Sequence, residues 1–387
     1  MKLSLEGLKN KGEWEAAGIA LPGYDVENAA KKAQTAPRWA HLGIGNIFRI
    51  FIGSIADGLL ENGKLDTALT CVETFDYDVV DKIYRPFDNL GLSVVLNTDG
   101  TRDYKVLGAF GEAVKAQSTD PEQWNRLKEI FVSPSLQLVS FTITEKGYAL
   151  TNAEGKYLPY VQADIDHGPD RATGAMAIVT SMLLERYKKG GTPLALVSMD
   201  NCSQNGSLLR SSVLTMTEEW LKRGYVDQGF ADYVENEDKV SFPWTMIDKI
   251  TPRPNPVIAA DLKALGVEDM EPVETSKRTY IAPFVNGEDP QYLVIEDHFP
   301  NGRPALEKGK GVYLGSRDTV NKSERMKVTA LLNPVHSAVA PLGVLLGEEF
   351  FATLINHDPK LMKLAKMVAY DEGMPMVPDP GILSPKA

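Results

Sequence analysis

Apolar and polar residues alternate along the chain in blocks that predict strands separated by helices. After a polar leader of residues 1–36, a short apolar run at 38–42 is followed by Gly43-Ile44-Gly45. In the next segment, 46–60, apolar residues recur every three or four positions. This pattern predicts a strand, a glycine turn and a helix. A second apolar run at 67–72 completes a βαβ unit.

The same alternation continues to about residue 300. The further apolar runs predict strands at 92–96, 136–143, 193–199 and 292–295, and the periodic segments predict helices at 172–187 and 207–222. Four prolines lie in the segment 242–256, so we expect a loop or a sheet edge there. Strands that alternate with helices of this length predict an α/β fold, with a Rossmann-like, doubly wound, mostly parallel sheet.

The C-terminal part of the chain follows a different pattern. Strand signals stop after about residue 318, and the segments 321–354 and 360–370 both predict helices. We therefore expect two domains. The first comprises residues 1–318 and contains the α/β sheet, and the second comprises residues 319–387 and is mainly helical.

Composition and charge narrow the class of protein. The 387 residues are 43% hydrophobic and 24% charged, which is typical of globular proteins. The formal net charge of -11 disfavours nucleic acid as a partner. Two cysteines, Cys71 and Cys202, are too few for a disulfide framework in a chain of this length.

Signals for export and for membrane insertion are weak. The N-terminus has no unbroken apolar region of the kind that a secretory signal needs. The most apolar late stretch, 337–347, is shorter than a membrane-spanning segment, and Pro341 interrupts it. We expect a cytoplasmic, soluble protein that binds a small molecule and neither nucleic acid nor membrane. The oligomeric state stays open.

The glycine turn is the first candidate site. Glycines at positions 43 and 45 allow the backbone to turn sharply and approach a pyrophosphate, which would then lie at the N-terminal amides of the following helix. Phe48 stands where the usual fingerprint has a third glycine. Glycine turns between a strand and a helix also occur for structural reasons alone, so the turn favours a dinucleotide without establishing one.

Glu73 ends the second predicted strand, where a carboxylate would bind the ribose hydroxyls of the adenosine and repel a 2′-phosphate. That role predicts NAD in preference to NADP. Glu73 lies further from Gly45 than the usual spacing of about 20 residues. Asp76 is a rival for the role, and a solvated acid at a strand end would account for Glu73 equally well.

Asp200 and Asn201 directly follow an apolar strand, at the edge where open α/β sheets bind ligands. A helix cap is the alternative interpretation, because such residues satisfy free amides at a helix start.

Lys327, Asn333 and His336 lie in an otherwise apolar helical segment. Asn333 and His336 are three residues apart and share a helix face, whereas Lys327 would point about 120° away from Asn333 on a regular helix. Pro334 removes a hydrogen bond of the preceding turn and predicts a kink or a π-type turn, which would bring Lys327 round. We expect these polar side chains to be buried with partners, which favours a site over a single core histidine. The scattered histidines and the lack of a CxxC pair give no support to a metal site and do not exclude one.

Several blocks, in this order, resemble the long-chain, metal-independent polyol dehydrogenases of the mannitol dehydrogenase family. The resemblance covers about residues 38–340 and rests on Gly43–Arg49, Thr142–Tyr148, Asp200-Asn201 with Asn205-Gly206, Thr245–Pro252, Val294–Asp297 with Gly302–Pro304, and Lys327–Ser337. It implies NAD as the cofactor, a Rossmann-type, NAD-binding domain at residues 1–318, and a helical domain for substrate and catalysis at residues 319–387. The cofactor-binding residues that we expect are Gly43, Ile44, Gly45, Asn46, Arg49, Glu73, Thr142 and Asp248.

The resemblance also implies an active site without a metal. Lys327 takes the role of general base, Asn201 and Asn333 polarise the reacting oxygen, and His336 orients the substrate. Preorganised amide donors in a dry site can hold a developing alkoxide, and burial can lower the pKa of a lysine enough for base catalysis near neutrality. The resemblance therefore favours the amide role of Asn201 over the helix cap.

The implied activity is hydride transfer between NAD(H) and a keto-sugar acid or a ketose. Within the family we favour conversion of fructuronate to mannonate, with mannitol 2-dehydrogenase and tagaturonate reductase as alternatives. A nucleotide-binding protein without turnover is the rival from another class.

Two departures from the family pattern matter. Family forms have five residues from the base to its asparagine, and Lys327 to Asn333 is one longer. Family members also continue with helices whose arginine and lysine bind substrate. We find no counterparts before Ala387, so we expect the helical domain to be partial.

Overall fold

The computed structural model describes residues 1–97, 99–347 and 358–382, and the chain divides into two compact units. The first unit comprises Met1–Leu293 and His298–Val312, and the second comprises Val294–Asp297 and Tyr313–Ala387. The boundary predicted between residues 318 and 319 lies close to this division. The roles assigned to the two domains stay proposals.

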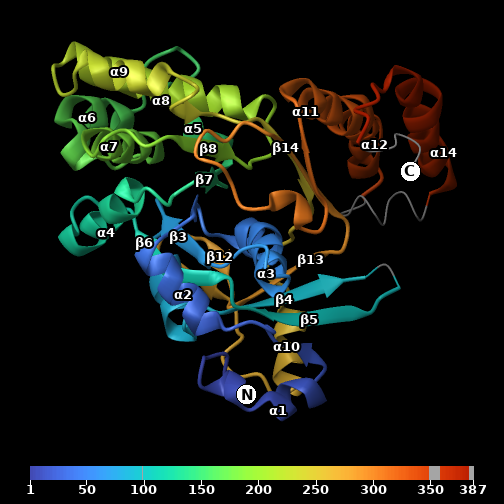
Figure 1. Cartoon of the computed structure of the whole chain (residues 1–387). Helices are drawn as coiled ribbons and strands as arrows, with labels where there is room; N and C mark the ends of the chain where they lie inside the picture. The colour runs from blue at the N-terminus through green and yellow to red at the C-terminus, as the bar shows by residue number, and fades with distance from the viewer. Residues whose placement is uncertain (98, 348–357, 383–387) are drawn as a thin grey trace. The chain divides into compact units, whose positions relative to one another are not determined.

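A six-stranded sheet in the order β6-β3-β2-β7-β8-β9 organises the first unit (Figure 1). All neighbouring strands are parallel, and Ala40 lies opposite both Thr70 and Val139. The chain leaves the central strand β2 first in one direction and then in the other, which is the doubly wound order. The predicted fold class is therefore confirmed. The strands are β2 (Trp39–Leu42), β3 (Leu69–Glu73), β6 (Phe110–Lys115), β7 (Leu138–Phe141), β8 (Leu194–Ser198) and β9 (Val240–Ser241).

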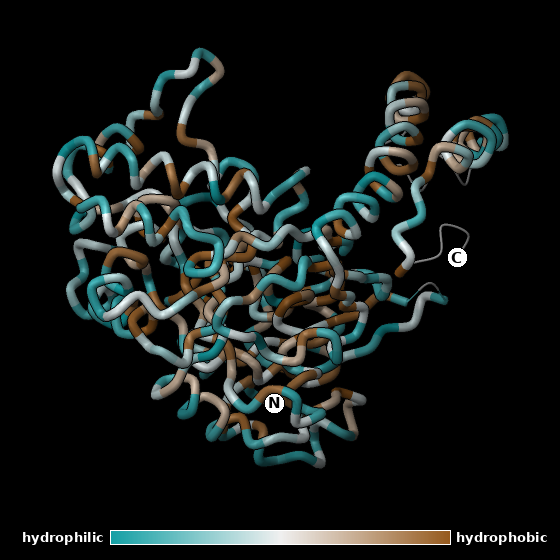
Figure 2. The backbone as a smooth tube through the Cα atoms, turned by 45° about the horizontal axis from the view of Figure 1, so that its top comes forward, coloured by the Kyte–Doolittle hydropathy of each residue, from teal (hydrophilic) through white to brown (hydrophobic). Residues whose placement is uncertain are grey.

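Helices cover both faces of this sheet. As a result, every residue of β2, β3, β7 and β8 is buried. Strands buried on both faces appear in sequence as continuous apolar runs, which explains why these strands are predictable. Figure 2 shows hydrophobic stretches concentrated in the interior of this unit. The helices of this part are α3 (Ser54–Glu61), α4 (Pro121–Val132), α5 (Thr144–Tyr148), α6 (Pro159–His167), α7 (Ala175–Lys188), α8 (Asn205–Lys222) and α9 (Gln228–Glu235).

A second sheet in the first unit has the order β1-β5-β4-β13. The predicted strand 92–96 is β4, but it pairs antiparallel with β5 and parallel with β13, outside the main sheet. An apolar run predicts that a strand forms but not which strand it pairs with. The placement of β4 in the second sheet could therefore not be predicted from the sequence. The strands are β1 (Ile19–Ala20), β4 (Gly91–Leu96), β5 (Arg102–Leu107) and β13 (Phe284–Glu288).

The N-terminal leader is part of this second core and not a separate polar segment. Leu3, Trp14 and Ile19 are buried against Leu92 and Phe284. The apolar residues of the leader are too widely spaced to show a periodic pattern, so their burial cannot be predicted from the sequence. The helices packed here are α1 (Lys11–Ala16) and α10 (Pro256–Ala264), whereas α2 (Val26–Thr35) contacts β6 and β3 of the main sheet.

The remaining strands of the described residues form two small sheets. The predicted strand 292–295 is β14, the middle strand of a sheet in the order β10-β14-β15, and β10 lies at its edge as the prolines around it predict. The division between the two units falls within β14 and at the start of β15. The strands are β10 (Thr245–Lys249), β14 (Gln291–Glu296) and β15 (Val312–Gly315), with a separate hairpin of β11 (Val273–Glu274) and β12 (Tyr280–Ile281).

The second unit is helical, as predicted. Its small core contains Val339, Leu361 and Ala365. The predicted helix 321–354 is described as far as residue 347, and residues 348–357 lie outside the described part. The elements are α11 (Arg317–Glu324), the π-helix η7 (Arg325–Leu332), α12 (Asn333–Leu345), α14 (Pro359–Lys366), the π-helix η8 (Met367–Gly373) and the short 3-10 helix η9 (Met374–Met376).

One helical run, Arg317–Leu345, is long and apolar enough to cross a membrane by length and composition. Only 11% of its most apolar window is buried. The expectation based on the stretch 337–347 is thus incomplete, because the helical run begins well before that stretch. Core helices of soluble proteins meet the same criterion, although they are mostly buried.

Candidate active site

The glycine turn leaves the carboxyl end of β2, at the centre of the six-stranded sheet. Gly43 has a φ of +89°, and a Cβ at this position would lie 2.3 Å from the carbonyl oxygen of Thr142. No other residue fits there without moving the neighbouring strand. A Cβ added at Gly45 would meet no described atom within 4 Å. The backbone at Gly45 is therefore open to the close approach of a ligand.

Phe48 replaces the third glycine and begins a π-helical turn, η2 (Phe48–Gly53), that continues into α3. Its buried ring stacks on His41 with the ring centroids 4.2 Å apart. Close contact between helix and sheet occurs instead at Gly53, where a Cβ would lie 2.5 Å from the Phe110 ring. The glycine that a Rossmann fingerprint has at the third position is thus displaced by five residues.

A chain of hydrogen bonds through His41 holds the glycine turn. Trp39 Nε1 donates to Ser140 Oγ at 2.7 Å, and Ser140 Oγ lies 2.6 Å from His41 Nδ1. His41 Nε2 lies 2.9 Å from Thr142 Oγ1, which donates to the Gly43 carbonyl at 2.8 Å.

This chain fixes the tautomer of His41. The single hydroxyl proton of Thr142 is used on Gly43, so Thr142 accepts from His41, and the imidazole proton is on Nε2. Nδ1 then accepts from Ser140. Burial lowers the pKa of His41 to about 3, so the ring is neutral. The sequence does not single out His41, because a histidine in an apolar strand gives no sign of its partners.

Glu73 lies at the carboxyl end of β3, where it is predicted. Its oxygens already accept backbone amides: Oε2 from Ile44 at 3.2 Å, and Oε1 from Thr74, Phe75 and Asp76 at 3.0 to 3.2 Å. Burial raises the pKa of Glu73, and the four amides oppose this shift. Glu73 therefore ties its own loop to the glycine turn, and it is not the solvated strand-end acid of the alternative interpretation.

Asp76, the rival of Glu73, has one buried oxygen without a partner among the described residues. Its Oδ2 accepts from the Thr275 hydroxyl at 2.6 Å, whereas Oδ1 has no hydrogen bond. A buried, unsatisfied carboxylate oxygen at this edge of the sheet suits a ligand hydroxyl. Phe75 beside it is 66% exposed, with Lys277 Nζ 5.3 Å from its ring centroid. Phe75 and Lys277 cannot be paired from the sequence, because they lie far apart along the chain.

Arg49 does not face the open side of the glycine turn. Its side chain is buried, and its guanidinium donates to the carbonyls of Ala282 at 2.7 Å and Pro283 at 3.3 Å and to Asn46 Oδ1 at 2.8 Å. Burial lowers the pKa of Arg49 to about 10. Arg49, which lies in η2, thus connects the helix after the glycine turn to the segment before β13 of the second sheet, and Asn46 holds its guanidinium. The local sequence does not indicate this tertiary role.

Asp200 and Asn201 lie just beyond β8. Asp200 Oδ2 accepts from the Ile143 amide at 2.9 Å and the Tyr148 hydroxyl at 2.6 Å, and Oδ1 accepts from the Thr144 amide at 2.9 Å. Burial raises the pKa of Asp200, and these hydrogen bonds oppose the shift.

Neither residue caps the helix that follows. Helix α8 begins at Asn205, and its N-cap residue, Gln204, makes no side-chain cap. The Asn201 side chain is exposed. The cap interpretation is therefore wrong for α8, although Asp200 accepts the two amides at the start of α5.

The two remaining cofactor candidates in the first unit lie on different sheets. Thr142 directly follows β7, and its hydroxyl belongs to the chain through His41. Asp248 is half-buried in β10, an edge strand of the three-stranded sheet.

The second unit holds the other predicted catalytic residues. Lys327 lies in the π-helix η7, so the π-type turn predicted from Pro334 is confirmed. Lys327 is half-buried, and burial lowers its pKa. Asn333 and His336 are exposed, so the expectation that they are buried is wrong for the described residues. Among the described residues, α12 buries only Val339 and Gly343, so an apolar neighbourhood in sequence does not bury every side chain on it.

The predicted catalytic residues are thus divided between the units, with Asn201 in the first and Lys327, Asn333 and His336 in the second. Their assembly into one site is a proposal.

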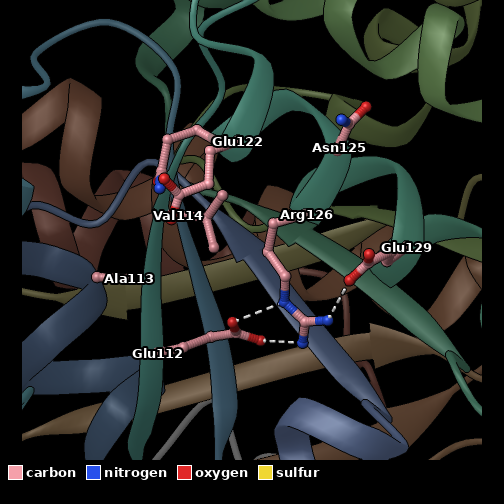
Figure 3. A pocket seen from close by; sticks show the side chains of 8 residues that line it. Glu112, Ala113, Val114, Glu122, Asn125, Arg126 and Glu129 are labelled. Atoms are coloured by element: carbon pink, nitrogen blue, oxygen red, sulfur yellow. Dashed lines mark hydrogen bonds and ion pairs between the residues drawn. The ribbon is translucent and has the colours of Figure 1, made fainter.

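A cavity of about 480 Å³ lies elsewhere, between β6 and α4 at the outer edge of the main sheet. Arg126 lies between Glu112 and Glu129 there and forms ion pairs with both (Figure 3). Among the described residues that line this cavity, none is a predicted site residue. The chemistry of the carboxyl edge of the sheet, and not this cavity, indicates the site.

Comparison with known proteins identifies relatives. Residues 37–308 match the family description "Mannitol dehydrogenase Rossmann domain". The chain is 47% identical over all 387 residues to a D-mannonate oxidoreductase of Thermotoga maritima, of which it covers 71%.

Two solved structures are similar along almost the whole chain. The Pseudomonas fluorescens mannitol 2-dehydrogenase, in a ternary complex with NAD and D-mannitol, superposes with a TM-score of 0.79 at 26% identity. That match covers 100% of this chain and 72% of the other. A D-sorbitol dehydrogenase in substrate-free form gives the same TM-score and identity, over 96% of this chain and 70% of the other.

Proposed function

The chain belongs to the mannitol dehydrogenase family, and from this premise we propose that it is an NAD-dependent oxidoreductase that interconverts D-fructuronate and D-mannonate. The observation that carries the choice of substrate is the 47% identity to a D-mannonate oxidoreductase along the whole chain. Identity to the mannitol 2-dehydrogenase of known structure is 26%. The difference favours the sugar acid over the polyol.

The glycine turn fits NAD. Gly45 leaves backbone open where a pyrophosphate would lie, at the start of the helix that continues into α3. Asp76 Oδ1 is a buried acceptor without a partner among the described residues, which suits a ribose hydroxyl. Phe75 offers an exposed ring next to it. We propose that the turn residues 43–46, Thr142 and Asp248 bind the cofactor, with Glu73 and Arg49 holding the loops around it.

NAD, when bound, supplies the carbon that accepts or donates the hydride. In the proposed mechanism the neutral Lys327 amine takes the hydroxyl proton of mannonate and returns it to the keto oxygen of fructuronate in reduction. The amides of Asn201 and Asn333 donate hydrogen bonds to that oxygen and stabilise the charge that develops on it. His336 orients a neighbouring substrate hydroxyl. The lowered pKa of Lys327 supports its role as the base.

Mannitol oxidation and tagaturonate reduction are the alternatives within the family. A nucleotide-binding protein without turnover is the alternative from another class. The chain spans 71% of the length of the Thermotoga maritima relative. We propose a cytoplasmic location, which the two free cysteines support.

The direct test mixes the protein with NADH and, in separate reactions, fructuronate, tagaturonate and fructose, and follows the loss of NADH absorbance. We expect the highest kcat/KM with fructuronate. A higher value with either other substrate would contradict the substrate assignment. NADH binding without oxidation of any of the three would contradict the enzymatic function itself.

A further inference from the structure

We propose that Asp200 is a positioning residue that fixes the catalytic amide of Asn201 relative to the glycine turn. The inference rests on the proposed function. It starts from the three hydrogen bonds that the Asp200 carboxylate accepts, from Ile143, Thr144 and Tyr148, which we call the Asp200 clamp.

The clamp holds a strained segment. Thr144 has a φ of +62°, in the left-handed region that a β-branched residue rarely adopts. Such a conformation persists only where surrounding contacts enforce it. The amide of Thr144 and that of Ile143 before it both donate to Asp200 at 2.9 Å, so the carboxylate helps to hold this conformation.

The clamped segment contacts the glycine turn directly. A Cβ on Gly43 would lie 2.3 Å from the Thr142 carbonyl oxygen and 2.9 Å from the Ile143 side chain. The Thr142 hydroxyl also donates to the Gly43 carbonyl at 2.8 Å. A shift of residues 142–144 would therefore move the turn that we assign to the cofactor.

The backbone around Asn201 is fixed from the other side. Asn205 is buried, and its Nδ2 donates to the Asp200 carbonyl at 3.0 Å and to Thr245 Oγ1 at 2.8 Å. The Thr245 hydroxyl in turn donates to the Ser198 carbonyl at 2.6 Å. Residues 198–200 are thus attached to β10 as well as to the segment after β7, and Asn201 stands exposed at the end of a fixed turn.

Together these contacts form one path, from the glycine turn through residues 142–144 and Asp200 to Asn201. An amide donor stabilises a developing oxyanion only when it is preorganised, and a displacement of about 1 Å can cost roughly 100-fold in rate. Asp200 has two acceptor oxygens that face two backbone amides, and an asparagine would turn an N–H toward one of them. The replacement Asp200→Asn therefore opens the clamp with little change in volume.

The experiment compares Asp200→Asn with two controls. Tyr148→Phe removes one hydrogen bond of the clamp and leaves both amide contacts. Asp170→Asn removes an exposed carboxylate elsewhere in the same unit. We expect Asp200→Asn to lower kcat for fructuronate about 10-fold to 100-fold per NADH-binding site. We expect Tyr148→Phe to lower it by about 3-fold or less and Asp170→Asn to leave it unchanged.

Two further readouts separate positioning from simple loss of fold. The primary isotope effect with deuterated NADH should increase in Asp200→Asn, because hydride transfer becomes slower than product release. Amide exchange at Ile143 and Thr144 should accelerate about 10-fold or more while exchange in α7 stays unchanged. A kcat per binding site equal to wild type, or unchanged exchange at residues 143 and 144, would overturn the proposal.

The wild-type protein distinguishes this outcome from failure of the proposed function. If wild type oxidises NADH with none of the keto substrates, the function is wrong, and amide exchange alone then decides whether the Asp200 clamp exists.

Discussion

Lys327 combines the two properties that a general base needs in this mechanism, a half-buried amine and a pKa lowered by that burial. The base must be neutral to accept the hydroxyl proton of mannonate. The rate of mannonate oxidation should therefore rise with pH and level off above the Lys327 pKa. Fructuronate reduction needs the protonated amine and should fall over the same pH range. An inflection below 10.5, the ordinary lysine value, is expected because the shift is downward.

Replacing Lys327 with Met should abolish the proton transfer and keep the length and apolar character of the side chain. We expect kcat to fall by about 10² to 10⁴-fold, with the NADH dissociation constant little changed because Lys327 is not among the residues that we assign to cofactor binding. The control is Lys322→Met, which removes a lysine that pairs with Asp318 on α11. Retained turnover in Lys327→Met would show that another group is the base.

His41 gives a second prediction at the scale of one residue. Its pKa is about 3 in the folded protein, below the ordinary 6.5, so the unfolded chain binds more protons between these values. Folding stability should be present in full above about pH 6.5 and should decrease as the pH falls toward 3.

The measurement is the midpoint of urea unfolding at pH 7, 6, 5 and 4, in wild type and in His41→Asn. The variant should be less stable at pH 7, because the chain from Trp39 to Gly43 is broken, and its stability should depend less steeply on pH. Equal pH slopes in the two proteins would contradict the assignment of this titration to His41.

At the scale of the element, the strand, turn and helix at residues 39–61 contain two glycines that are needed for different reasons. Gly43 is required by the fold, because its φ is positive and its Cβ would collide with the Thr142 carbonyl. Gly45 meets no such restriction among the described atoms. Substitutions at the two glycines can therefore distinguish an effect on folding from an effect on cofactor binding.

Gly43→Ala should destabilise the protein by about 1–3 kcal/mol and weaken NADH binding with it. Gly45→Ala should change the free energy of unfolding by no more than about 0.5 kcal/mol. It should still weaken NADH binding about 10-fold or more, because the new methyl group occupies the space proposed for the pyrophosphate. Unchanged NADH affinity in Gly45→Ala would argue against this placement of the cofactor.

At the scale of the whole molecule, catalysis is proposed to use amides and a lysine from two units, without a metal. The net charge of -11 means that the carboxylate of a sugar acid must meet its cation locally and gains nothing from the overall field.

Dialysis against EDTA should therefore leave kcat/KM for fructuronate almost unchanged, since in the proposed mechanism the amides of Asn201 and Asn333 perform the polarisation that a metal would otherwise perform. Activity that is lost with EDTA and restored by Zn²⁺ or Mg²⁺ would contradict this mechanism. A dialysis control without chelator accounts for losses in handling.

The sequence by itself determined the four central strands of the main sheet, β3, β2, β7 and β8, because strands buried on both faces are continuous apolar runs. The outer strands β6 and β9 were not predicted. The sequence also determined the π-type turn around Lys327, since proline removes a backbone donor wherever the helix folds. The family motifs indicated the candidate residues in their order along the chain.

Tertiary structure alone decided which partners those residues meet. Glu73 binds four backbone amides, Arg49 binds carbonyls more than 230 residues away, and Asp200 holds the segment after another strand. Hydrogen bonds between distant segments depend on how the strands are ordered in the sheet. A local pattern of residue types carries no record of that order, so the supporting contacts of the site became visible only in the folded chain.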